Sequence, residues 1–333
     1  MNTVAAIDCG TNSIRLLICS VIALDDDEVQ LLDVERRMEV VRLGQGVDRT
    51  GAFAPEALER TFAALRGYAE LMREHGVEFG PESVRMVATS ATRDAANRQE
   101  FIDGVRAIIG VEPEVISGDE EAELSFIGAT AELEAAEEAA EGFERPYLVV
   151  DIGGGSTEFV LGHKDAVGAG AVRASRSVDV GCVRMTERHL HGDPPTAEQV
   201  AAATADVDAA LDEAAAVVPL AEAATVVCVA GTATTVAGIA LELPEYDSER
   251  IHHTRVSVER VRAIAALLLA MPHDERAAIG VMHPGRVDVI GAGALVLERV
   301  LARTRADGFV ASEHDILDGI AWSLLLGGVD EAG

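Results

Sequence analysis

Residues 151–158 read DIGGGSTE and combine two carboxylates with glycines and hydroxyl groups. The segment contains Asp151, Gly153, Gly154, Gly155, Ser156, Thr157 and Glu158. Glycines lack the side chain that keeps a ligand away from the backbone, so their N–H groups can approach an anion closely, and the hydroxyl groups add donors. The segment therefore predicts a phosphate-binding loop, with an ordinary tight hairpin turn as the alternative.

The two carboxylates of this segment suggest a bound metal. Asp151 ends a predicted strand and Glu158 lies on the returning strand, so a tight turn would bring both near a phosphate held by the loop. Mg²⁺ prefers hard oxygen ligands and is commonly held by one or two carboxylates together with substrate phosphates and water. We expect Asp151 and Glu158 to hold Mg²⁺; the alternative is that both are exposed strand residues.

A second, weaker segment of the same kind lies at the start of the chain. Residues 8–13 read DCGTNS and contain Asp8, Gly10, Thr11, Asn12 and Ser13. We expect backbone and hydroxyl donors for phosphate here, with Asp8 holding a metal or its water. Such turns are frequent in ordinary hairpins, so much of the support for this site comes from its second copy.

Glu121 is a candidate for activating water. Ser117 and Glu120 have the spacing of a capping box, in which Glu120 would turn back to the backbone and leave Glu121 free. Glu121 would then orient a water toward phosphorus. The alternative is that it only complements the helix dipole.

Two further strand-to-helix turns carry small and hydroxyl residues. Arg93, in VATSATRD, could clamp phosphate, although a surface salt bridge with Asp94 or Glu100 would also explain it. Gly231 and Thr232, in VAGTATT, could offer helix N-terminal donors to an anion; the alternative is that Thr232 caps that helix.

The elements that position these residues follow from the apolar pattern. We expect a meander of strands at residues 4–7, 14–22 and 30–41, a helix from Pro55 to about residue 75, a strand at 83–88, a helix at 93–109, a strand at 113–116 and a helix from Ser117. The pattern then restarts, with strands at 148–152, 156–161 and 166–175 followed by helices.

The second half therefore repeats the first, which indicates a duplicated α/β domain. We expect an N-terminal domain at residues 1–128 and a C-terminal domain at 129–333, with a connector at about 131–145. Two similar domains facing one another would place both loops on opposite walls of one cleft.

Composition and net charge limit the expected binding partners and the expected cellular compartment. The formal charge of −30 over 333 residues argues against nucleic acid or an anionic membrane as a partner. The four cysteines show no paired spacing and lie in apolar surroundings, which favours a reducing cytoplasm. No apolar stretch approaches the roughly 20 residues that span a bilayer, so we expect no membrane span. The nine histidines show no metal-ligand spacing.

Together the segments DCGTNS, ATSATRDA, SGDEEA, DIGGGSTE, VGCVRMTE and VAGTATT resemble the exopolyphosphatase and guanosine pentaphosphate phosphatase family, in its usual order and over almost the whole chain. SGxEEA before DIGGGSTE is the most specific part. Thr11 stands where the family often has serine, and Thr92 where an aliphatic residue is common. The chain ends soon after SEHDILDGIAW, so it resembles the short, two-domain form.

The resemblance implies two actin-like, ribonuclease H-like domains with the active site in the cleft between them. It implies hydrolysis of terminal phosphoanhydride bonds with Mg²⁺ or Mn²⁺, with Glu121 as the catalytic glutamate. Asp151 and Glu158 match the metal-binding carboxylates, and Asp8, Asn12, Arg93 and the loop at 153–157 match the metal and phosphate contacts.

The expected substrate is inorganic polyphosphate, with guanosine pentaphosphate as the alternative. A homodimer is possible, because enzymes of this type often pair through the second domain. Two other classes stay open: an actin-like sugar or carboxylate kinase, and a non-catalytic nucleotide sensor.

Overall fold

The structure is a computed structural model that describes residues 2–23, 29–130, 143–163 and 172–326. It forms two compact units: unit 1 comprises residues 1–124 and 316–333, and unit 2 comprises residues 125–315. The predicted division at 128/129 falls inside a helix, and the prediction missed that the chain returns to unit 1. Most of the predicted connector, 131–142, lies outside the described residues.

Unit 1 is built on a five-stranded sheet in the order β3-β2-β1-β4-β5. Its strands are β1 (Asn2–Cys9), β2 (Ser13–Ala23), β3 (Val29–Val40), β4 (Val84–Ala88) and β5 (Glu114–Val115). β1, β2 and β3 are antiparallel neighbours, while β4 and β5 run parallel to β1. The predicted meander is therefore correct.

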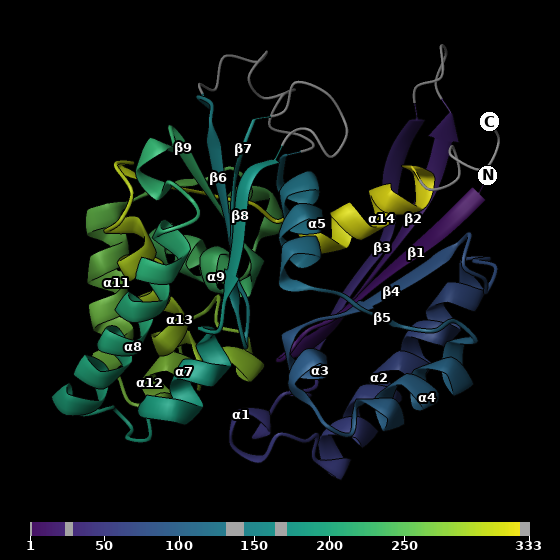
Figure 1. Ribbon diagram of the computed structural model, residues 1–333, viewed down its shortest axis with the longest axis horizontal. Coiled ribbons are helices and arrows are strands. Elements are labelled where there is room, and N and C mark those ends of the chain that lie inside the picture. The colour runs from purple at the N-terminus through teal and green to yellow at the C-terminus, as the bar shows by residue number, and fades with distance from the viewer. Residues whose placement is uncertain (1, 24–28, 131–142, 164–171, 327–333) are drawn as a thin grey trace. The chain divides into compact units, whose positions relative to one another are not determined.

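Helices cover both faces of this sheet (Figure 1). The helices of unit 1 are α1 (Val47–Thr50), α2 (Pro55–Glu74), α3 (Ser90–Asp94), α4 (Arg98–Ile109), the first half of α5 (Gly118–Thr130) and α14 (Ile316–Leu326). Ala5, Ile7 and Cys9 of β1 pack in the core that contains α2 and α4, whereas Val4 and Ala6 pack in the core that contains α14. Because side chains alternate along a strand, Asp8 lies on the α14 face.

The helix predicted at 93–109 is two helices, α3 and α4. The backbone becomes extended at Ala95, and the side-chain amide of Asn97 accepts a hydrogen bond from Phe53 N–H and donates one to Phe53 C=O. These contacts with a distant segment interrupt a pattern that is locally compatible with one helix.

Unit 2 repeats this topology, with the order β10-β11-β9-β6-β7-β8. Its strands are β6 (Tyr147–Ile152), β7 (Thr157–Gly162), β8 (Val172–Val178), β9 (Thr225–Val229), β10 (Arg255–Ser257) and β11 (Gly308–Ala311). β6, β7 and β8 form the antiparallel part, β9 and β11 run parallel to β6, and β10 adds an edge strand. Both units therefore have the strand order of the ribonuclease H-like fold. The predicted third strand, 166–175, overlaps β8, and residues 164–171 lie outside the described residues.

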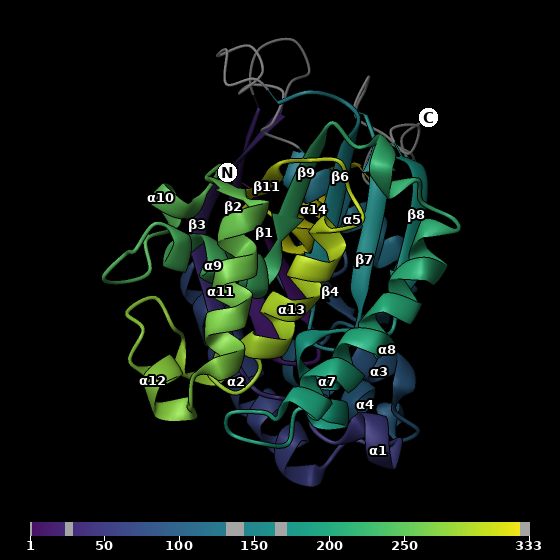
Figure 2. The same cartoon turned by 90° about the vertical axis from the view of Figure 1, so that its left-hand side faces the viewer.

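The main core of unit 2 lies between this sheet and its helices. The longer helices are α7 (Cys182–His189), α8 (Ala197–Ala215), α9 (Ala230–Ala240), α11 (Val258–Ala270) and α13 (Ile290–Leu301). The short ones are α10 (Ser248–Ile251), α12 (His273–Ala277), η2 (Leu220–Glu222) and η3 (Pro284–Arg286). α11 and α13 lie side by side (Figure 2). Val150 and Ile152 of β6 point into this core, so Asp151 lies on the opposite face of the sheet.

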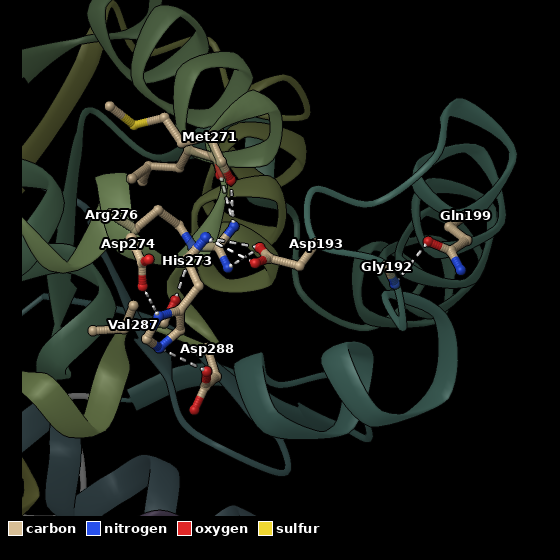
Figure 3. A network of polar contacts seen from close by, with 10 residues as sticks. Gly192, Asp193, Gln199, Met271, His273, Asp274, Arg276, Val287 and Asp288 are labelled. Atoms are coloured by element: carbon tan, nitrogen blue, oxygen red, sulfur yellow. Dashed lines mark hydrogen bonds and ion pairs between the residues drawn. The ribbon is translucent and has the colours of Figure 1, made fainter.

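A buried arginine holds the loops at one end of unit 2 together (Figure 3). Arg276 donates hydrogen bonds to the carbonyl groups of Met271 and Val287, at 2.7 and 3.0 Å, and to the Asp193 carboxylate at 3.0 Å. Asp193 also accepts a hydrogen bond from the backbone N–H of His273. The guanidinium therefore satisfies carbonyl groups that would otherwise be buried without donors.

Among the described residues, no helix has both the length and the apolar character needed to cross a membrane. All four cysteines are buried and free.

Candidate active site

The loop at 153–156, between β6 and β7, is held through its carbonyl groups. Gly153 N–H donates to Ser156 C=O at 3.0 Å and closes the turn. The carbonyl oxygens of Gly153 and Gly154 accept hydrogen bonds from backbone N–H groups at the start of α7, and the carbonyl of Gly155 accepts one from the Arg184 guanidinium at 2.6 Å. Within the described residues, the N–H groups of Gly154 and Gly155 have no hydrogen-bond partner. The loop therefore presents backbone donors, as an anion-binding nest does.

Gly181 makes this arrangement possible. A β-carbon at this position would lie 2.5 Å from the carbonyl carbon and oxygen of Gly154 and 2.7 Å from the nitrogen of Gly155. No side chain fits there, because these neighbours are backbone atoms of the loop itself. Gly181 thus lets the start of α7 approach the loop closely enough to bind its carbonyl groups.

The loop at residues 10–13 in unit 1 is built in the same way. Gly10 N–H donates to Ser13 C=O at 3.0 Å, and the carbonyl groups of Thr11 and Asn12 accept hydrogen bonds from the segment after β3. That segment contains Gly44, where a β-carbon would lie 2.3 Å from Cγ2 of Thr11. Gly44 is therefore the counterpart of Gly181. The N–H groups of Thr11 and Asn12 have no hydrogen-bond partner among the described residues.

The Thr11 hydroxyl has a structural partner, because its Oγ1 lies 2.9 Å from Oγ of Ser90 at the start of α3. Both side chains are buried. The Thr11 hydroxyl, which was predicted to help bind phosphate, thus also joins the loop to α3.

Asp151 and Glu158 lie directly opposite one another on β6 and β7, and Ser177 lies opposite Glu158 on β8. Directly opposite residues of antiparallel strands project from the same face of the sheet, and their β-carbons are about 5 Å apart. Both carboxylates are buried, with 6% and 1% of the residue surface exposed. Ser125 of α5 donates a hydrogen bond to Asp151 at 2.9 Å, and Ser177 donates one to Glu158 at 2.7 Å.

This pair of carboxylates suits Mg²⁺. It offers two hard, anionic oxygen ligands on one face of the sheet, next to a loop that presents donors for phosphate. Among the residues that the structure describes, no group of three or more His, Cys, Asp or Glu side chains could hold a metal ion. A metal held here would therefore take its remaining ligands from substrate phosphate and water.

The equivalent pair in unit 1 has a different charge. Asp8 lies opposite Arg15 on β1 and β2, in the same register as Asp151 and Glu158. The Arg15 guanidinium donates two hydrogen bonds to Oδ2 of Asp8, at 3.0 and 2.7 Å. Because this ion pair offsets the charge of Asp8, the geometry favours the pair in unit 2 as the cation site. The role predicted for Asp8 as a metal ligand stays a prediction.

Glu121 is buried on the first turn of α5 and pairs with Arg93. Arg93 Nη1 lies 2.7 Å from Oε2 of Glu121 and 3.0 Å from the carbonyl oxygen of Ile116. The alternative partners of Arg93, Asp94 or Glu100, are thus replaced by a residue 28 positions along the chain. The expectation that Glu121 is free is wrong. A carboxylate held at one oxygen by a guanidinium has a fixed orientation.

Only half of the predicted capping box forms. The Ser117 hydroxyl accepts a hydrogen bond from Glu120 N–H at 3.1 Å, but the Glu120 side chain pairs with Arg85 at 3.1 Å. Arg85 also binds Glu114. The Glu120 side chain thus forms an ion pair with a residue far away in the sequence instead of the predicted hydrogen bond to the backbone.

The third predicted turn, at Gly231 and Thr232, lies beside the loop of unit 2, because β9 pairs with β6 and Val229 lies next to Asp151. Helix α9 starts after Val229 with no side-chain cap among the described residues, so the alternative in which Thr232 caps the helix is wrong. The Thr232 side chain is instead buried against Gly293. Within the part of the chain that the structure describes, the first N–H groups of α9 thus have no side-chain cap.

Sequence reasoning missed several residues around these loops. The guanidinium of Arg286 packs against Gly231, where a β-carbon would lie 2.3 Å from Cζ, and it donates to the Thr235 hydroxyl at 3.2 Å. Arg286 places a positive charge at the start of α9. Nothing in the local pattern points to it. The other missed residues are Gly44, Gly181, Ser125 and Ser177, of which Gly181 had a signal as the glycine of VGCVRMTE.

Comparison with known proteins gives consistent matches over almost the whole chain. The sequence model of the Ppx/GppA phosphatase family matches residues 21–326. The chain is 49% identical over 333 residues to exopolyphosphatase 2 of Mycobacterium tuberculosis, a match that covers 97% of this chain and 99% of the relative.

Two solved structures support the same fold. An exopolyphosphatase from Cytophaga hutchinsonii is 25% identical with a TM-score of 0.81, covering 98% of both chains. The PPX-GPPA enzyme of Aquifex aeolicus is 28% identical with a TM-score of 0.75, covering 97% of this chain and 99% of that one.

Proposed function

Because the chain belongs to the Ppx/GppA phosphatase family, we propose that it is an exopolyphosphatase that releases terminal orthophosphate from inorganic polyphosphate. The observation that carries the proposal is the position of two residues on α5. This helix holds Glu121 and, four residues later on the same face, Ser125, whose hydroxyl donates to Asp151. The same helix thus carries the candidate base and a residue that binds a candidate metal ligand.

In the proposed reaction, the backbone donors of the loops hold the oxygens of the terminal phosphates. The Glu121 carboxylate accepts a proton from a water molecule while the water oxygen attacks the terminal phosphorus. The P–O bond to the bridging oxygen breaks, and the shortened polyphosphate leaves as an anion. Arg93 fixes the orientation of Glu121. Because the leaving group is a stable anion, positioning and charge stabilisation can supply most of the catalysis.

Asp151 and Glu158 would hold Mg²⁺, or Mn²⁺ in its place. The ion would offset the negative charge of the phosphates. Local charge compensation of this kind matters in a chain with a formal charge of −30, which otherwise repels a polyanion. The predicted phosphate contacts Gly231 and Thr232 belong to the same proposal.

We place the protein in a reducing cytoplasm. Its four thiols are free and buried. Burial raises the pKa of Cys182 to about 11 and also raises the pKa of Cys9 and Cys228. Thiols that stay protonated react slowly with oxidants and other thiols. We also propose that nucleic acid and membranes are not partners, and the possible homodimer stays a prediction.

The test is phosphate release by Glu121→Gln, with Glu120→Gln as the matched control. Removing a general base typically lowers the rate by about 10²–10⁴-fold. Glu120 is the adjacent carboxylate and pairs with Arg85 on the surface, so its replacement should leave the rate within about twofold of the wild type, as expected for an exposed ion pair. Near-normal turnover by Glu121→Gln would refute its role as base.

The substrate is tested by measuring phosphate release from polyphosphate, guanosine pentaphosphate and ATP side by side, each with and without Mg²⁺. A higher kcat/KM for polyphosphate is expected. A preference for guanosine pentaphosphate would change the substrate within the same reaction. Transfer of phosphate from ATP to an acceptor would instead identify a kinase, and nucleotide binding without phosphate release would identify a sensor.

A further inference from the structure

The candidate metal-binding carboxylates of unit 2 are each bound by a serine hydroxyl. We propose that Ser125 and Ser177 are positioning residues, which hold Asp151 and Glu158 in the orientation needed to bind a divalent cation. The inference rests on the proposed function and deepens it. It concerns two residues that do not contact the substrate in the proposed reaction.

Ser125 acts from the helix. Its side chain is fully buried, and its hydroxyl lies 2.9 Å from Oδ2 of Asp151. An ionised carboxylate can only accept hydrogen bonds, so the serine must be the donor. A hydrogen bond to Oδ2 fixes the rotation of the carboxylate about its last bond and therefore the direction of Oδ1. The same helix carries Glu121 one turn earlier.

Ser177 acts from the sheet. Asp151, Glu158 and Ser177 form a row across three neighbouring strands, since each lies directly opposite the next. The Ser177 hydroxyl donates to Oε1 of Glu158 at 2.7 Å. Glu158 has one more rotatable bond than aspartate and is 1% exposed, so this contact selects one direction for a side chain that could otherwise turn.

The donors to Asp151 and Glu158 described here are neutral hydroxyl groups, whereas Asp8 and Glu121 are bound by charged guanidinium groups. In unit 1 the Arg15 guanidinium donates to Asp8, and the Arg93 guanidinium donates to Glu121. A guanidinium offsets the carboxylate charge and repels an approaching cation. A serine hydroxyl orients the carboxylate but carries no charge, so the hydrogen bonds from Ser125 and Ser177 do not themselves offset the charge of Asp151 and Glu158. Neutral outer donors of this kind tune metal sites.

The experiment measures Mn²⁺ binding to the purified full chain, without polyphosphate, by electron paramagnetic resonance. Ser125→Ala and Ser177→Ala should each weaken Mn²⁺ binding by about 10-fold or more, the usual effect of losing a partner of a metal ligand. Ser177 is half-buried, so Ser177→Thr should be accommodated and, because it keeps the hydroxyl, should restore most of the affinity.

Thr130→Val is the matched control for Ser125→Ala. Thr130 is also buried on α5, and its hydroxyl donates at 2.7 Å to the carbonyl of Phe126 instead of to a carboxylate. Its loss should lower stability slightly and leave Mn²⁺ affinity unchanged. Urea unfolding of every variant separates loss of fold from loss of the site. Ser177→Ala provides a second route if Ser125→Ala does not fold.

The outcomes separate this inference from the proposed function. Wild-type binding that Asp151→Asn abolishes, together with unchanged binding by both serine-to-alanine variants, would overturn the positioning role and leave the proposed function intact. Wild-type binding that Asp151→Asn does not alter would overturn the metal assignment and this inference with it. A loss of affinity in Thr130→Val equal to that in Ser125→Ala would show a general effect of helix stability and would also overturn the inference.

Discussion

Gly181→Ala should damage the phosphate loop of unit 2 through a single added methyl group. Gly181 has φ −152° and ψ 168°, an extended conformation that alanine adopts without strain. Any effect must therefore come from contact. The new β-carbon would lie 2.5 Å from the carbonyl carbon and oxygen of Gly154, whereas such atoms normally stay about 3.5 Å apart. The loop or the start of α7 must therefore move by about 1 Å.

The expected magnitude follows from that displacement. Overpacking of this kind typically costs about 1–3 kcal/mol of stability. A displacement of about 1 Å in a substrate-binding group can lower the rate about 100-fold, which corresponds to about 2.7 kcal/mol. We expect kcat/KM for polyphosphate to fall by that factor while the variant still unfolds cooperatively.

The assay is steady-state phosphate release at several polyphosphate concentrations, with urea unfolding of the same preparations. Gly67→Ala is the control, because Gly67 lies within α2 and a β-carbon there meets nothing within 4 Å. It should gain up to about 1 kcal/mol of stability and keep normal activity. Wild-type kcat/KM in Gly181→Ala would refute the view that the bonds from α7 hold the loop in its active conformation.

Three further predictions concern stability. Thr92→Val should raise the free energy of unfolding by about 1 kcal/mol, because the Thr92 hydroxyl is buried without a hydrogen-bond partner among the described residues; equal stability in urea would contradict this. Arg276→Met should lower it by about 3 kcal/mol by leaving carbonyl groups without donors, and a loss below about 1 kcal/mol would show that water replaces the guanidinium. Burial alone would raise the pKa of Asp208, but hydrogen bonds from Arg299 and Arg303 outweigh it and lower that pKa. The charged form thus stabilises the fold above the unfolded-state pKa of about 3.9, and this contribution is lost as the pH falls through the lower folded-state pKa. The stability difference between wild type and Asp208→Asn, measured by urea unfolding from pH 7 to pH 2, should therefore shrink below about pH 4; a constant difference would contradict the assignment.

Local patterns predicted most elements of the fold. The alternating apolar residues of β1, β2 and β3 gave the meander, and Pro55 marked the first position of α2. The repeated aspartate-headed loops predicted the duplication that the two sheets confirm. These signals are local, because side-chain alternation and turn residues depend on neighbours within a few positions.

The side-chain partners could not be predicted in the same way. Glu120 satisfies a capping pattern locally, yet it pairs with Arg85, because the fold brings β4 next to the start of α5. Glu121 binds Arg93 for the same reason. The return of α14 to unit 1 was missed because it depends on contacts of α14 with β1, β2 and β4, which lie far from it in the sequence. Such choices depend on contacts far apart in the sequence, which a single sequence does not reveal.

Equivalent strand positions in the two units carry different residues. Arg15 lies opposite Asp8 in one unit, and Glu158 lies opposite Asp151 in the other. Two halves that descend from one ancestor begin as redundant copies, and each could once have substituted for the other. Opposite charges at one equivalent position end that redundancy, because one half has two acidic residues there and the other has an ion pair. The two halves are therefore not interchangeable at this position, although they share one topology.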